Sequence, residues 1–281
     1  MKNDKIIVFL GGDVFGPVGM RCVTALLPGF IQKEAVDFTI INGENATGGV
    51  GLSEADARSI LAAGSDVITG GNHTFEKRDF WPVLDSMSEV LRPSNYPNIP
   101  GSELPGRGGA VYEKNGLRFA VLNLQGREDM PSLDCPFRAA DAQLALWNAE
   151  YSAEAGLPAK LPLIFVDFHA ESNQEKEALG CYLDGRVVSV TGTHTHVQTA
   201  DERILPSGTA YMSDLGMTGP LLSVIGVDPV FAIKRNITQV LYRMEAYESR
   251  GALRGLLVEI DPVARQATLV TRVELAESAQ P

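Results

Sequence analysis

Every histidine of the 281-residue chain stands at the end of a predicted β-strand. His73 ends "SDVITGGNH", His169 ends "LIFVDFH", and His194 and His196 end "RVVSVTGTHTH". Imidazole binds transition metals and acts as a general acid or base near neutral pH. Four such groups at strand ends therefore indicate a metal site, a catalytic site or both.

Carboxylates and amides occupy similar positions after the other predicted strands. Asp13 follows "KIIVFLGG", Glu44 and Asn45 follow "VDFTIING", and Asn72 directly precedes His73. In open α/β sheets, binding sites form beyond the carboxyl ends of the strands. We therefore expect loops at one sheet edge to bring these oxygen ligands and the histidines together.

The candidate ligands form a mixed oxygen and nitrogen set, which suits manganese, iron, zinc and similar ions. The set contains no cysteine, which argues against a structural zinc site. A single four- to six-coordinate ion would leave several candidates unused, whereas two ions about 3.5–4 Å apart, bridged by a carboxylate and a water, would use them all. The neighbouring glycines are expected in tight turns that let the backbone pass close to the ions. They are Gly11, Gly12, Gly70, Gly71 and Gly192.

Each residue alone also fits an ordinary structural role. Asp13 after Gly-Gly could close a turn, "GEN" is a common loop sequence, and His169 could be a hydrogen-bonded core histidine. His194 and His196 are more specific, because a period of two places both imidazoles on one face of an extended segment. The combination favours a metal site, since no histidine is left for another role.

The rest of the sequence alternates strand and helix patterns. Helices are expected over 17–34, 53–64, 77–87, 136–155, 172–185 and 229–241. Ser53 should cap the second of these and Gly64 should stop it. Hairpins are expected at Asn115-Gly116 and around "DPVAR", a surface loop at 148–162, and a frayed tail at about 276–281. This pattern predicts a layered α/β fold, with one mixed sheet or two stacked sheets, in a single domain over residues 1–281.

Composition and short sequence motifs exclude several classes of protein. A net charge of −11 argues against general nucleic-acid binding but allows a single nucleotide or a metal. Cys22, Cys135 and Cys181 are far apart and are expected to be reduced thiols. The N-terminal apolar run is too short for a signal peptide, and no segment is long enough to span a membrane, so we expect a cytoplasmic protein. "GGDVFG" does not match G-x-G-x-x-G, which sets aside a Rossmann dehydrogenase.

The motifs "GD", "GEN", "GNH", "DFH" and "GTHTH", in this order, resemble the calcineurin-like metallophosphoesterase superfamily. The longer strings "NGENATGG", "GNHTFEK", "LRPSNYP" and "GTHTHVQTADERILPSGTAYMSDLGMTGP" are similar to its YmdB-like branch, from about Lys5 to the last hairpin. The resemblance implies a four-layered α/β/β/α sandwich with two mixed β-sheets and a di-metal centre. It also implies phosphodiesterase activity on 2′,3′-cyclic nucleotides and assembly as a homo-oligomer.

The resemblance also implies a role for each candidate residue. One metal would be held by Asp13, Asn45 and His196, the other by Asn72, His169 and His194, and Glu44 would bridge them. His73 would be the catalytic histidine that binds no metal. The two divalent ions would be iron or manganese, with zinc and magnesium as alternatives.

Two positions depart from the superfamily pattern. Phe15 stands where Asp-x-His has its histidine, and Glu44 replaces the usual bridging aspartate. Asn45 is expected to replace the lost imidazole, which would make that metal site harder. The implied mechanism is attack on phosphorus by a metal-bridging hydroxide, with His73 as the general acid for the leaving oxygen.

Other functions stay open on the sequence alone. The same metal core would serve a phosphomonoesterase or 5′-nucleotidase, and a non-catalytic metal-binding signalling scaffold is an alternative of a different class. The expected partner is a small phosphodiester or nucleotide, with no stable nucleic-acid binding and no membrane. Arg107 and Arg127 could contact a phosphate, although surface ion pairing is the more frequent role of an arginine.

Overall fold

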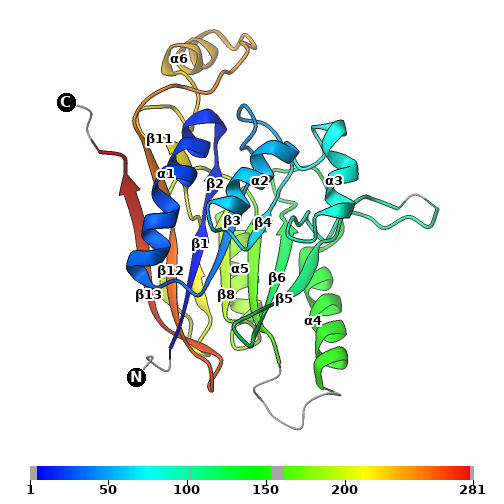
Figure 1. Ribbon diagram of the computed structural model, residues 1–281. Helices are drawn as coiled ribbons and strands as arrows, with labels where there is room; N and C mark the ends of the chain where they lie inside the picture. Colours follow the sequence, from blue (N-terminus) through cyan, green and yellow to red (C-terminus); the bar gives the residue numbers. More distant parts are fainter. Residues whose placement is uncertain (1–4, 102, 153–160, 279–281) are drawn as a thin grey trace.

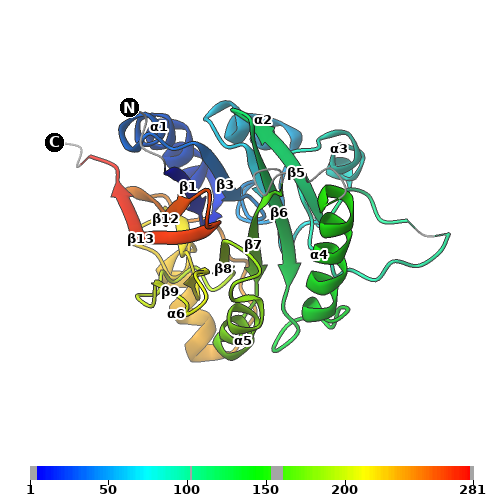
Figure 2. The same cartoon turned by 90° about the horizontal axis from the view of Figure 1, so that it is seen from below.

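Two β-sheets lie face to face, and helices cover the outer face of each (Figures 1 and 2). The structure is a computed structural model that describes residues 5–101, 103–152 and 161–278. The layers are helices, sheet, sheet and helices, which confirms the predicted four-layered α/β/β/α sandwich with two mixed sheets. No helix in the described ranges is long and apolar enough to cross a membrane.

The first sheet has seven strands in the order β2-β11-β12-β1-β3-β4, with β13 paired to β12. They are β1 (Ile6–Gly11), β2 (Asp13–Val14), β3 (Phe38–Asn42), β4 (Val67–Thr69), β11 (Met217–Pro220), β12 (Gly251–Asp261) and β13 (Gln266–Ala276). β1, β3 and β4 run parallel, so their carboxyl ends share one edge. The predicted last hairpin is the antiparallel pair of β12 and β13.

The second sheet has six strands in the order β5-β6-β7-β8-β10-β9. They are β5 (Gly109–Lys114), β6 (Leu117–Gln125), β7 (Leu163–His169), β8 (Ser189–Thr193), β9 (Arg203–Ile204) and β10 (Ala210–Met212). β6, β7, β8 and β10 are parallel. The predicted hairpin turn joins β5 to β6, and Asn115 and Gly116 both have the positive φ that a type I′ turn requires, 54° and 78°.

The helices divide between the two outer faces. α1 (Gly16–Glu34), α2 (Glu54–Ala62), the 3₁₀ turn η1 (Arg78–Phe80) and α3 (Trp81–Ser86) pack on the first sheet, and α4 (Pro136–Ser152) and α5 (Asn173–Leu183) pack on the second. α6 (Pro229–Thr238) projects from one end of the molecule (Figure 1). Ser53 caps α2 as predicted, because its side chain accepts a hydrogen bond from Asp56 N.

Four predicted boundaries need correction. The helix expected over 229–241 ends at Thr238. The helix expected over 77–87 is a 3₁₀ turn followed by the short α3. The first part of the loop expected at 148–162 belongs to α4, which continues to Ser152, while 153–160 lie outside the described residues. Glu277, expected in a frayed tail, accepts hydrogen bonds from Arg21 and Gly251, and residues 279–281 lie outside the described ranges.

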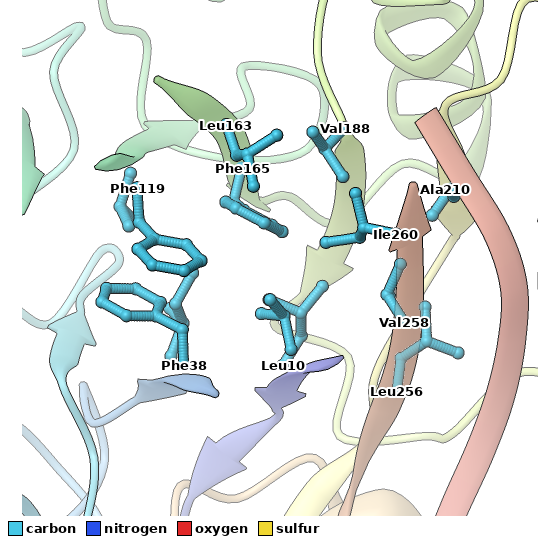
Figure 3. Packing of buried hydrophobic residues seen from close by; sticks show 14 of the residues in the cluster. Leu10, Phe38, Phe119, Leu163, Phe165, Val188, Ala210, Leu256, Val258 and Ile260 are labelled. Carbon is cyan, nitrogen blue, oxygen red and sulfur yellow. The ribbon is translucent and has the colours of Figure 1, made fainter. Parts of the chain in front are cut away.

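The core between the sheets follows from strand alternation. Ile6, Val8 and Leu10 of β1 belong to one buried apolar cluster with Phe119 and Val121 of β6. Across the sandwich, the ring of Phe38 on β3 stacks on that of Phe119, with the ring centroids 4.2 Å apart (Figure 3). Toward the carboxyl ends of the strands, the same inward positions become polar. Those positions are Asn42 on β3, Thr69 on β4, Asn123 on β6, Asp167 on β7, and Thr191 and Thr193 on β8, all of them buried. This buried polar layer separates the apolar core from the edge where the candidate ligands lie.

Candidate metal centre

Three predicted ligands from different elements meet at this edge. Glu44, His169 and His194 place one ligand atom each within 4.8 Å of one another. The Nε2 atom of His169 lies 2.9 Å from Asn72 Oδ1, 3.1 Å from Glu44 Oε1 and 3.0 Å from His194 Nδ1. These four residues follow β3, β4 and β8 or end β7, so both sheets contribute to the cluster.

His169, His194 and also His196 each have one ring nitrogen beside a protein acceptor. His169 Nδ1 lies 3.0 Å from the Thr193 hydroxyl, and His194 Nε2 lies 3.2 Å from Glu171 Oε2. His196 Nδ1 lies 2.9 Å from the carbonyl oxygen of Ile225. A proton on each of these nitrogens leaves the other ring nitrogen with a lone pair, as in metal-ligating histidines.

The atoms that face one another are therefore mostly acceptors. A lone pair on His169 Nε2 would confront the oxygens of Asn72 and Glu44 and the free nitrogen of His194. Such a cluster is stable only with a positive charge among its members, either a proton or a cation. The donor set thus fits divalent metal ions.

Asp13 and Asn45 extend the cluster on its other side. Asp13 is fully buried, and within the described chain its Oδ1 has no hydrogen-bond partner, although it lies 3.6 Å from His169 Nδ1. Asn45 Nδ2 lies 2.9 Å from Glu44 Oε1 and 3.2 Å from His196 Nε2. Ligation through the Asn45 oxygen would require this amide to turn over, which changes neither its shape nor its volume.

Burial and charge set the protonation of the metal-free cluster. Burial opposes charge on the His169 ring, but Glu44 and Asp13 outweigh it and raise the pKa of His169 to about 9. Burial would raise the pKa of Glu44, but His169 lowers it to about 2. Burial, together with the positive His169, lowers the pKa of His194 to about 3, and burial raises the pKa of Asp13 to about 6.

These pKa values predict that metal uptake releases a proton. At neutral pH, His169 is protonated in the metal-free protein because its pKa is about 9. A cation that binds Nε2 displaces about one proton, so metal affinity should rise with pH up to about 9 and then level off. Below about pH 6, Asp13 also binds a proton, so affinity should fall more steeply there. Calorimetry at one pH in buffers of different ionisation enthalpy measures this release, and heats that are independent of the buffer would contradict it.

His73 lies beside the cluster. Its backbone N–H donates to Glu44 Oε2 at 3.1 Å, while its side chain is one-third exposed, 33%. Its Nδ1 lies 3.5 Å from Glu76 Oε1 and, among the described residues, makes no hydrogen bond. The ring therefore stands at the border between the buried cluster and solvent, where a small molecule can reach it.

Glycines near the site allow close packing, and Gly71 also begins a predicted tight turn, because its carbonyl oxygen accepts the N–H of Thr74 at 3.2 Å. None of the five glycines expected in turns has a positive φ. A Cβ on Gly71 would collide with Glu44 and His169, so this position must lack a side chain for the two side chains to approach each other.

The prediction that His194 and His196 lie on one face of an extended segment is wrong. β8 ends at Thr193, and the two histidines have φ of 105° and 65°, so they do not belong to an extended segment with a period of two. Both still reach the site, because the backbone turns sharply on either side of Thr195. Phe15, which replaces the superfamily histidine, packs its ring edge-on against His196 with centroids 5.3 Å apart.

Several supporting residues escaped the sequence analysis. Glu171, two positions after His169, is the carboxylate beside His194, and Asp214 accepts hydrogen bonds from the backbone and hydroxyl of Thr195. Glu171 could have been found from its place in "DFHAE", whereas nothing local marks Asp214.

Arg127 lies 4.0 Å from Glu175, an ion pair that accounts for its position. Arg107 is exposed, and its carbonyl oxygen accepts a hydrogen bond from Arg92.

Stacked mixed sheets with an imidazole, carboxylate and amide cluster at one edge define a protein of the metallophosphoesterase type. The NAD nucleotidase of Haemophilus influenzae shares the fold, with a TM-score of 0.58 at 14% identity over 97% of this chain and 50% of that one. A family model described as "YmdB-like protein" matches residues 9–273, and the chain belongs to this family.

Two relatives match nearly end to end. The 2′,3′-cyclic-nucleotide 2′-phosphodiesterase of Bacillus subtilis (strain 168) is 44% identical over 267 residues, which cover 95% of this chain and 96% of the relative. The crystal structure of a phosphatase from Mycoplasma pneumoniae has a TM-score of 0.85 and 31% identity, and the match covers 97% of this chain and 94% of that one.

Proposed function

We propose that this protein is a metal-dependent phosphoric-diester hydrolase that acts on small phosphodiesters, with 2′,3′-cyclic nucleotides as the preferred substrates. The observation that carries the proposal is the convergence of lone-pair atoms from His169, His194, Glu44 and Asn72 at one sheet edge. The 44% identity to a 2′,3′-cyclic-nucleotide phosphodiesterase supports the choice of substrate.

The proposed cofactors are two divalent ions, iron or manganese. When bound, they supply Lewis acidity toward the phosphoryl oxygens and an ionised water at neutral pH. Glu44 is proposed to bridge them, because its two carboxylate oxygens already face different neighbours, Asn45 and the backbone N–H of His73. Asp13, Asn45 and His196 would hold one ion, and Asn72, His169 and His194 the other.

His73 is proposed to protonate the leaving oxygen. Hydrolysis of a cyclic diester breaks one bond between phosphorus and a ribose oxygen, and the departing alkoxide is a strong base that needs a proton. His73 borders the cluster through its backbone N–H on Glu44, while its ring is one-third exposed and its Nδ1 makes no hydrogen bond among the described residues. Glu76, 3.5 Å from Nδ1, would orient the ring and leave Nε2 for the substrate.

Metal analysis combined with substrate assays tests the proposal. The purified protein should contain two transition-metal ions per chain and hydrolyse 2′,3′-cAMP faster than 3′,5′-cAMP or a nucleoside monophosphate. Bis-p-nitrophenyl phosphate should likewise be cleaved faster than p-nitrophenyl phosphate. Faster cleavage of the monoesters would favour a phosphomonoesterase or 5′-nucleotidase. Two bound metals with no hydrolysis of any ester would favour the signalling scaffold.

A cytoplasmic location and a homo-oligomeric state are parts of the same proposal. The three cysteines are unpaired, which suits a reducing compartment.

In α6 only Ala232 is buried, while Val230, Phe231, Ile233 and Ile237 are exposed. Because a helix with this much exposed apolar surface gains little from the rest of the chain, a second copy is its proposed cover. Light scattering of the purified protein measures the oligomeric state.

A further inference from the structure

The buried polar layer beneath the site is centred on one carboxylate that the proposed mechanism does not use. Asp167 lies two residues before His169 on β7, and its side chain points between the sheets. It accepts hydrogen bonds from the hydroxyl of Thr69, from Asn42 Nδ2 at 3.0 Å and from Thr193 Oγ1 at 2.8 Å. These three donors come from β4, β3 and β8, so the carboxylate joins both sheets.

The direction of these hydrogen bonds determines which nitrogen of His169 carries a proton. The Thr193 hydroxyl has one proton, and it donates that proton to Asp167 Oδ1. Its oxygen can therefore only accept from His169 Nδ1, 3.0 Å away. The ring is thus held with a proton on Nδ1, and Nε2 faces Glu44, Asn72 and His194.

A second branch from the same carboxylate reaches Glu44. Asn42 donates its amide N–H to Asp167, and its amide oxygen accepts the backbone N–H of Glu44 at 3.1 Å. Asp167 therefore connects the strand that carries His169, in one sheet, to the loop that carries Glu44, in the other. Every residue in both branches is buried, so water does not compete for these hydrogen bonds.

We propose that Asp167 is a positioning residue for the metal centre. Through Thr193 it fixes the His169 ring with Nε2 toward the ligand cluster. Through Asn42 it holds the loop of Glu44, whose Oε1 lies 3.1 Å from that nitrogen. The inference rests on the proposed function in one respect, namely that His169 binds metal. Partners of this kind typically contribute roughly 10–100-fold to metal affinity.

The test compares Thr193→Val with Thr193→Ser. Valine keeps the shape of threonine but removes the hydroxyl, whereas serine keeps the hydroxyl. Mn²⁺ affinity, measured by competition with a chromogenic chelator, should fall roughly 10–100-fold in Thr193→Val and stay within about threefold of the wild type in Thr193→Ser. Equal affinities in all three proteins would overturn the proposal, and so would an equal loss in both variants.

Thr191→Val is the matched control. Thr191 is buried on the same face of β8, but among the described residues its hydroxyl donates to the carbonyl of Val166 alone, at 3.5 Å. This variant should keep wild-type Mn²⁺ affinity, and thermal unfolding of all variants reports whether they fold. If Thr193→Val does not fold, ¹⁵N NMR of the zinc-loaded wild type decides, because the proposal requires the His169 proton on Nδ1 and a proton on Nε2 would refute it.

The two proposals can fail separately. A wild type that binds Mn²⁺ without hydrolysing phosphodiesters would end the proposed function but leave the Thr193 comparison valid. A wild type that hydrolyses 2′,3′-cAMP, with Thr193→Val equal to it in metal affinity, would end this inference and leave the function intact.

Discussion

His73→Ala is expected to lower the turnover of 2′,3′-cAMP by roughly 10²–10⁴-fold, the contribution of a positioned general acid, while both metal ions stay bound. The metals should stay because Glu44 is held by the backbone N–H of His73, which alanine retains. Among the described residues, no hydrogen bond or ion pair joins the His73 ring to His169 or His194, so its removal should leave the ligand cluster unchanged.

The choice of substrate separates acid catalysis from other roles of His73. p-Nitrophenolate leaves without needing a proton, so His73→Ala should impair cleavage of bis-p-nitrophenyl phosphate much less than cleavage of 2′,3′-cAMP. Metal content is measured on the same preparations. Loss of the metals, or an equal loss of activity on both substrates, would show that His73 acts as a ligand or a structural residue and not as the acid.

Much of the candidate site could be predicted because the sequence shows where each strand ends. "LIFVDFH" and "SDVITGGNH" each show where an apolar strand stops, and parallel strands stop at a common edge. This rule placed Asp13, Glu44 and His169 near one another although 156 positions separate the first from the last. The hairpins were equally local, since Asn-Gly fixes the backbone of a turn by itself.

The parts that could not be predicted depend on partners far apart in the chain. Asp167 was visible only as part of a buried strand, because its donors lie on three other strands. His194 and His196 occupy left-handed backbone conformations that cost of order 1–3 kcal/mol each for residues other than glycine, so local propensity argues against them. Such a backbone persists only where surrounding contacts determine it, and no period in the sequence reveals those contacts.

One of these contacts is a buried ion pair behind the turn that carries the two histidines. Lys176 of α5 and Asp214, which follows β10, are 1% and 0% exposed and lie 2.8 Å apart. Asp214 also accepts hydrogen bonds from the N–H groups of Thr195, at 3.0 Å, and Gly216, at 2.8 Å. The pair therefore fixes the backbone between His194 and His196.

Lys176→Met is expected to destabilise the fold by about 3–5 kcal/mol, the cost of leaving one member of a buried ion pair without its partner. Methionine fills most of the volume of the lysine stem, so the loss reflects the unpaired Asp214 charge more than a cavity. Urea unfolding followed by circular dichroism measures the change. The matched control is Lys33→Met on α1, whose lysine side chain is 80% exposed and, among the described residues, forms an ion pair with Glu34 alone. This variant should alter stability by no more than about 0.5 kcal/mol. If Lys176→Met unfolded at the same urea concentration as this control, the turn bearing the two histidines would have to be held by the hydrogen bonds of Asp214 alone, without its charge partner.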